Sequence, residues 1–146
     1  MRFWDASALV PLVIEEAGTA LARGWLAQDP HIVTWAMTST ELASAIERRA
    51  RAGLLDPATR RAALETIDQL SERWDEVTDV FAVRARARAL LARHALRAAD
   101  AAQLGAALLF HQDVVSGAPL VSLDRGLAAA AEREGFRPLT WPDEPR

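Results

Sequence analysis

Three absences narrow the chemistry open to this chain of 146 residues. It contains no cysteine, which excludes disulfides, thiolate zinc sites and a cysteine nucleophile. It contains no lysine, because all 17 basic residues are arginine, and this excludes Schiff-base catalysis and a P-loop lysine. No apolar run approaches the roughly 20 residues that a membrane helix needs. Any reaction must therefore use other side chains.

The residues that are present are those of a folded domain. Hydrophobic residues make up 51% of the chain, which is enough for a real core, and we expect one domain over residues 1–146. The net charge of −3 argues against a protein that coats nucleic acid, although it allows brief contact through a local patch. An acid at position 5 interrupts any signal-peptide core, so we expect a cytoplasmic protein without a membrane partner.

Short apolar segments alternate with helical patterns along the whole chain. This rhythm predicts an α/β fold, a three-layer α/β/α sandwich around a mostly parallel sheet of four to five strands. We expect Pro11 and Gly18 to interrupt the first helical region. The expected strands cover residues 2–4, 31–35, 74–77, 119–123 and 137–141.

Three acids follow expected strands. Asp5 ends the first strand, Glu41 lies a few residues after the second, and Asp124 ends a later one. Because parallel strands bring their carboxyl ends to one edge, and ligands bind in the crevice there, these acids should share that edge. Asp100 instead opens a helix whose apolar face carries Leu104 and Leu108. An acid directed inward needs a partner, so we expect Asp100 to join the others.

Each acid also has an ordinary structural interpretation. Glu41 fits a capping box that begins at Thr38, Asp5 and Asp124 fit helix N-caps, and Asp100 suits the positive end of a helix dipole. The coincidence of four acids at one predicted edge favours a site. Clustered carboxylates repel one another, and hard cations such as Mg²⁺ or Mn²⁺ relieve that repulsion.

Four segments surround the acids, and in chain order they are Asp5-Ala6-Ser7-Ala8-Leu9, Thr38-Ser39-Thr40-Glu41-Leu42, Leu96-Arg97-Ala98-Ala99-Asp100-Ala101 and Ser122-Leu123-Asp124-Arg125-Gly126-Leu127. These segments resemble the motifs of a known family, the PIN-domain nucleases. One departure is Ser122, which stands where the family often has threonine and keeps the hydroxyl.

The length and the coverage of the chain look most like the VapC toxins of bacterial toxin–antitoxin pairs. The resemblance implies a PIN-like fold and a metal-dependent endoribonuclease that uses Mg²⁺, with Mn²⁺ possible. It implies catalytic roles for Asp5, Glu41, Asp100 and Asp124, with Asp5 and Asp100 as the metal ligands. It also implies three kinds of partner: an RNA substrate, a cognate VapB-type antitoxin and a second copy in a homodimer.

Further residues have both functional and ordinary interpretations. Ser7 is either a holder of a metal-bound water or a helix-start hydroxyl. Arg97 is our best candidate for contact with substrate. The arginines at 48, 49 and 51 either contact phosphate or form a solvated face. The apolar residues Leu12, Val13, Trp25 and Leu26 form either core or a groove for an antitoxin helix.

Two other classes of protein share part of this pattern. An aspartyl-nucleophile phosphatase of the haloacid dehalogenase type also opens with an acid after its first strand. That chemistry needs a second acid at position 7, where this chain has Ser7, and a lysine, which it lacks. The other alternative is a catalytically silent PIN-like module that only binds a partner. The complete set of four acids argues against it.

Overall fold

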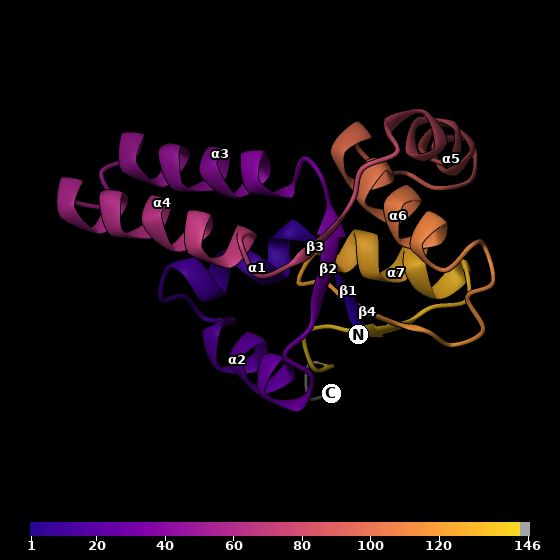
Figure 1. Ribbon diagram of the computed structural model, residues 1–146, viewed down its shortest axis with the longest axis horizontal. Coiled ribbons are helices and arrows are strands. Elements are labelled where there is room, and N and C mark those ends of the chain that lie inside the picture. The colour runs from indigo at the N-terminus through magenta and orange to yellow at the C-terminus, as the bar shows by residue number, and fades with distance from the viewer. Residues whose placement is uncertain (144–146) are drawn as a thin grey trace.

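A five-stranded sheet forms the centre of the computed structural model, which describes residues 1–143 (Figure 1). All four strand pairings are parallel, and the strand order is β3-β2-β1-β4-β5. The predicted α/β class is therefore confirmed, at the upper strand number expected. The strands are β1 (Arg2–Trp4), β2 (Ile32–Trp35), β3 (Asp75–Val77), β4 (Pro119–Val121) and β5 (Arg137–Leu139).

Helices cover both faces of the sheet. Figure 1 shows helices α1 to α4 on one side of the strands and α5 to α7 on the other. The predicted tail at residues 142–146 extends outside the described residues. The helices are α1 (Ala6–Val13), α2 (Thr19–Gln28), α3 (Thr38–Arg51), α4 (Pro57–Ser71), α5 (Val80–Arg93), α6 (Ala98–Phe110) and α7 (Arg125–Arg133).

Side chains that alternate between the two faces of the sheet build two separate cores. In β1, Phe3 packs in the core beneath α5, α6 and α7, whereas its neighbour Trp4 packs in the core beneath α1 to α4. In β4, Leu120 and Val121 divide between the same two cores. Successive side chains of a strand point to opposite faces, so a continuous apolar run suits a sheet that is covered on both sides.

Two local expectations were wrong. Pro11 lies inside α1 instead of interrupting it, because burial of this helix against the sheet outweighs one lost backbone hydrogen bond. Thr38 does not cap α3: the cap position is Met37, and no side chain caps that end. The Thr38 hydroxyl is buried and bonds Thr34 of β2 at 2.7 Å, so a tertiary contact replaces the local one.

The early helices supply part of the second core. Leu12 and Val13 of α1, and Trp25 and Leu26 of α2, are partly buried and pack against it. They are thus only partly available for the groove considered from the sequence. Within residues 1–143, no helix combines the length and the apolar character required to cross a membrane.

Candidate acidic active site

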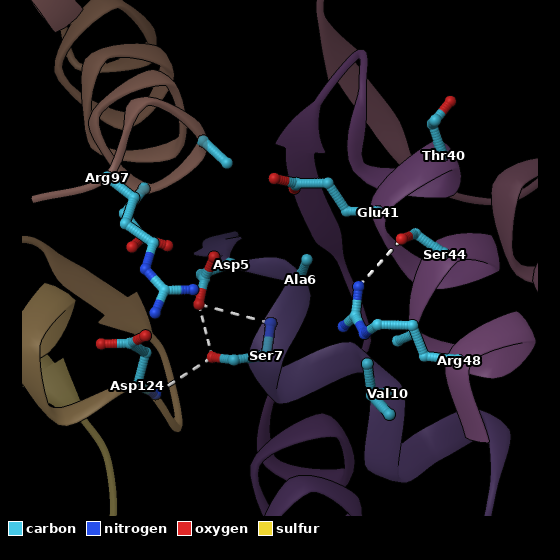
Figure 2. A pocket seen from close by; sticks show the side chains of 13 residues that line it. Asp5, Ala6, Ser7, Val10, Thr40, Glu41, Ser44, Arg48, Arg97 and Asp124 are labelled. Atoms are coloured by element: carbon cyan, nitrogen blue, oxygen red, sulfur yellow. Dashed lines mark hydrogen bonds between the residues drawn. The ribbon is translucent and has the colours of Figure 1, made fainter. Parts of the chain in front are cut away.

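A pocket of about 660 Å³ lies where the strands of the sheet end. Its walls include all four acids singled out from the sequence: Asp5, Glu41, Asp100 and Asp124. They come from four different segments, following β1, in α3, in α6 and following β4, and Figure 2 labels Asp5, Glu41 and Asp124 among them. The parallel sheet explains the convergence of Asp5 and Asp124, since β1 and β4 are neighbours whose carboxyl ends coincide.

Asp5 is the most buried of the four acids, with 3% of its surface exposed. It caps α1 by accepting from the backbone N–H of Ser7, and its Oδ2 also accepts from the hydroxyls of Ser7 and Ser122, the latter at 2.9 Å. Burial raises the pKa of the Asp5 carboxyl from 3.8 to about 6; the two serine bonds oppose the shift, and nearby Asp100 and Asp124 add to it.

Ser7 ties the loop after β1 to the loop after β4. Its hydroxyl donates to Asp5 and accepts from the backbone N–H groups of Leu123 at 2.9 Å and Asp124 at 3.1 Å. One proton and two lone pairs are all that a hydroxyl has. The first of the two interpretations of Ser7, that it holds a metal-bound water, would therefore require one of these bonds to break.

Glu41 receives a hydrogen bond from the side-chain amide of Gln103 on α6. Burial raises the pKa of the Glu41 carboxyl from 4.5 to about 7, the Gln103 bond opposes this, and the negative charges of Asp5 and Asp100 add to it. Sequence reasoning overlooked Gln103. Its signal was a polar amide on the otherwise apolar inner face of α6, where it is 1% exposed.

A chain of hydroxyl groups continues from Gln103 to the strand that carries Asp5. Gln103 Nε2 also donates to Thr38 Oγ1 at 3.0 Å, and Thr38 contacts Thr34 Oγ1 at 2.7 Å. Thr34 donates its only proton to the backbone carbonyl of Trp4 at 2.7 Å, so Thr38 must be the donor to Thr34. This buried chain connects α6, α3, β2 and β1 directly behind the pocket.

Asp100 and Asp124 complete the acidic wall. Burial and the charge of Asp124 raise the pKa of the Asp100 carboxyl, while the nearby Arg97 guanidinium opposes the rise. Asp124 Oδ1 accepts from the backbone N–H of Leu127 at 2.8 Å and caps α7, as its ordinary interpretation predicted. Asp5 and Asp124 are thus both helix caps and pocket residues, and the two interpretations do not compete.

The chemistry of these donors suits a hard divalent cation. The acids supply only oxygen, and for three of them burial and neighbouring carboxylates raise the pKa, so a cation would relieve the repulsion. In residues 1–143, however, no three acidic or histidine side chains form a preformed metal cage. Mg²⁺ commonly takes only one or two carboxylates and keeps several waters, so the residues present fit that mode of binding.

Two arginines also line the pocket. Arg97, expected from the sequence to contact substrate, points into the pocket from the start of α6 (Figure 2). Of the three arginines at 48, 49 and 51, only Arg48 lines it, and Arg49 pairs instead with Glu16 at 2.6 Å. None of the three histidines belongs to the pocket wall.

The fold and the pocket together define an α/β protein with an acid-lined crevice at the carboxyl edge of a parallel sheet. The model of the PIN domain family matches residues 2–133, and the chain belongs to that family. PIN domains are generally metal-dependent nucleases and typically use divalent metals. A search of curated proteins finds no match to this chain.

Proposed function

We propose that this protein is a metal-dependent endoribonuclease that hydrolyses RNA phosphodiester bonds at the acidic pocket. The observation that carries the proposal is the convergence of Asp5, Glu41, Asp100 and Asp124 on one pocket in a PIN-domain protein. Asp5 and Asp100 would hold Mg²⁺ or Mn²⁺. When bound, the ion would supply a lowered water pKa and stabilisation of charge on the phosphate oxygens.

The chain's own residues divide between ligation and positioning. Glu41 and Asp124 complete the acidic shell, directly or through water. Ser7 and Ser122 hold the Asp5 carboxylate in place through hydrogen bonds, and Gln103 does the same for Glu41. Residues that orient ligands in this way typically contribute 10- to 100-fold to metal affinity or activity, so the buried bonds matter for the reaction.

The biological role that we propose is that of a VapC-type toxin. The four motifs and the coverage of nearly the whole chain by the PIN family model support it. The proposal includes a cognate VapB-type antitoxin as partner, a homodimer, and the cytoplasm as the place where RNA is met. Light scattering on a size-exclusion column tests the dimer.

A cleavage assay tests the activity. Purified protein with Mg²⁺ or Mn²⁺ should cut RNA at internal bonds, and excess EDTA should abolish the cutting. Asp5→Asn and Asp100→Asn should each reduce cleavage at least about a hundredfold, more than the loss of an orienting residue. Asp75→Asn, which changes an exposed acid on β3 outside the pocket, is the matched control and should leave cleavage unchanged.

The outcomes separate the nuclease from the silent binding module. Cleavage that persists in EDTA, or that survives Asp100→Asn, rules out the metal mechanism. Absence of cleavage in the wild-type protein with either metal, across single-stranded and structured RNA, favours the binding module. For the toxin role, induced expression of the wild-type protein should arrest growth, and Asp5→Asn should not.

A further inference from the structure

Two arginines border the acidic pocket without a carboxylate partner. Within residues 1–143, neither Arg48 nor Arg97 forms an ion pair, although both line a pocket that contains four acids. By contrast, Arg49 pairs with Glu16 and Arg60 with Glu47, each at 2.6 Å. The guanidinium groups of the pocket are therefore available to a ligand that carries negative charge.

Arg48 lies at a distance from the acids along α3. Glu41, Ser44 and Arg48 follow one another at spacings of three and four residues, which places them on one face of the helix, and all three line the pocket. At 1.5 Å per residue, the backbone of Arg48 is about 10 Å beyond that of Glu41 along the axis, and its side chain reaches back toward Ser44. It donates to Ser44 Oγ at 2.9 Å, which holds the guanidinium against this wall.

Arg97 occupies the other wall. Figure 2 shows it on the side of Asp5 and Asp124, with Arg48 across the pocket beyond Ser44. Its charge already acts on the site, since it lowers the pKa of Asp100 against the effect of burial. Asp5 and Glu41 thus lie between two cationic groups, one from α3 and one from the start of α6.

We propose that Arg48 and Arg97 bind backbone phosphates on the two sides of the bond that is cut. This inference rests on the proposed nuclease function. Because Arg48 and Arg97 lie at opposite walls of the pocket, a strand that crosses it presents different phosphates to the two cations, since successive nucleotides of a stacked strand rise about 3.4 Å along its axis. Arginine suits the task because its guanidinium can hold a phosphate with two hydrogen bonds. The substrate is then a nucleic-acid strand that continues past the pocket in both directions.

Salt dependence of binding tests the phosphate contacts directly. Binding of a fluorescein-labelled single-stranded RNA to Asp5→Asn protein is followed by anisotropy over a range of NaCl at fixed Mg²⁺. Each contact with a single strand contributes about 0.7 to the slope of log affinity against log salt. In this background, Arg48→Gln and Arg97→Gln should each reduce the slope by about 0.7 and weaken binding about five- to tenfold. Arg51→Gln, an exposed arginine of α3 outside the pocket, should change neither.

Kinetics provide the second measurement. In the otherwise wild-type enzyme, Arg48→Gln should raise KM about five- to tenfold with kcat nearly unchanged, because the contact exists in ground and transition states alike. On a dinucleotide with a single phosphate, Arg48→Gln and wild type should have the same kcat/KM. Thermal unfolding checks that the variants are folded.

The outcomes distinguish this inference from the proposed function. If the wild-type protein cuts RNA but Arg48→Gln behaves like Arg51→Gln, the phosphate contact is refuted and the nuclease stands. If RNA binds with the expected slopes but is never cut, the nuclease is refuted and the binding surface stands. Failure of Asp5→Asn protein to bind RNA at low salt overturns the inference, as does an Arg48→Gln defect that persists on the dinucleotide.

Discussion

The amide nitrogen of Gln103 donates to the carboxylate of Glu41 although 62 residues separate them in the chain. Gln103 belongs to α6, on one face of the sheet, and Glu41 to α3, on the other. The bond therefore crosses the molecule at the carboxyl edge of the sheet, beside the pocket. Among residues 1–143, Gln103 Oε1 is buried without a hydrogen-bond partner, so the amide is satisfied on its donor side alone.

Gln103→Leu tests this bond. The change leaves Glu41 and Thr38 without their buried donor, which should cost about 1–3 kcal/mol of unfolding free energy. Cleavage should fall about 10- to 100-fold, because Glu41 loses its orienting partner. Urea unfolding and the cleavage assay measure the two effects. Gln69→Leu, at an exposed glutamine of α4, is the control, and a Gln103→Leu protein as stable and active as that control would contradict the prediction.

Stability of the metal-free protein should fall as the pH rises from 5 to 8. Folding raises the pKa of Asp5 from 3.8 to about 6 and that of Glu41 from 4.5 to about 7, so in this range the folded state binds more protons than the unfolded state. Stability then decreases with pH, by about 1.4 kcal/mol for Asp5 alone between pH 5 and 8, since one pKa unit is worth about 1.4 kcal/mol and its folded pKa lies about one unit above pH 5. Mg²⁺ should restore it at pH 8, because the ion binds the ionised carboxylates.

Comparison with Asp5→Asn isolates this effect. Burial lowers the pKa of His111, which adds stability with rising pH and opposes the carboxylates in the same window. The difference between wild type and Asp5→Asn cancels the His111 contribution. Thermal unfolding in EDTA at pH 5, 6, 7 and 8 gives the curve, and a difference that does not change with pH would refute the assignment.

Ser7→Ala should release Asp5 and weaken the junction between two loops. The change leaves the N–H group of Leu123 without its acceptor, at a cost of about 1–3 kcal/mol, whereas the N–H of Asp124 keeps Ser122 Oγ at 3.1 Å. The lost bond to Ser7 lowers the pKa of Asp5. The pKa of Asp5 should therefore rise further above its value of about 6. Unfolding in EDTA as a function of pH measures both the loss of stability and the rise in the pKa of Asp5. Ser71→Ala, which loses one bond to Asp68 O in its own helix, should cost less and leave the pH profile unchanged.

A pair of glycine variants tests the packing of α6. A Cβ at Gly105 would lie 3.1 Å from Val83 O and 3.2 Å from Ala87 N, both backbone atoms of α5, so Gly105→Ala should destabilise the protein by about 1–3 kcal/mol. A Cβ at Gly24, inside α2, would have nothing within 4 Å. Gly24→Ala should therefore stabilise by about 0.5–1 kcal/mol. Equal effects of the two changes on urea unfolding would show that the helices do not pack this closely.

Much of the architecture could be predicted from local patterns. Apolar runs such as Phe3-Trp4 identify strands covered on both faces, and the glycine at 135 marks the end of α7 with a φ of +99°. Asp5 and Asp124 could be expected to meet because parallel strands align their ends. In these cases the physical cause can be read within each segment, namely side-chain alternation, a backbone angle or an acid at the carboxyl end of a strand.

Other features depend on partners far away in the chain. The pattern from Thr38 to Glu41 resembles a capping box, yet Thr38 bonds Thr34 and Glu41 bonds Gln103, because buried polar groups take the partners that packing brings to them. Likewise, Arg48, Arg49 and Arg51 are alike in residue type, and it is the packing of α3 that turns the face shared by Glu41 and Arg48 toward the pocket. Residue types and spacings alone thus establish the strands, helices and acids, whereas the geometry of packing decides which side chains surround them.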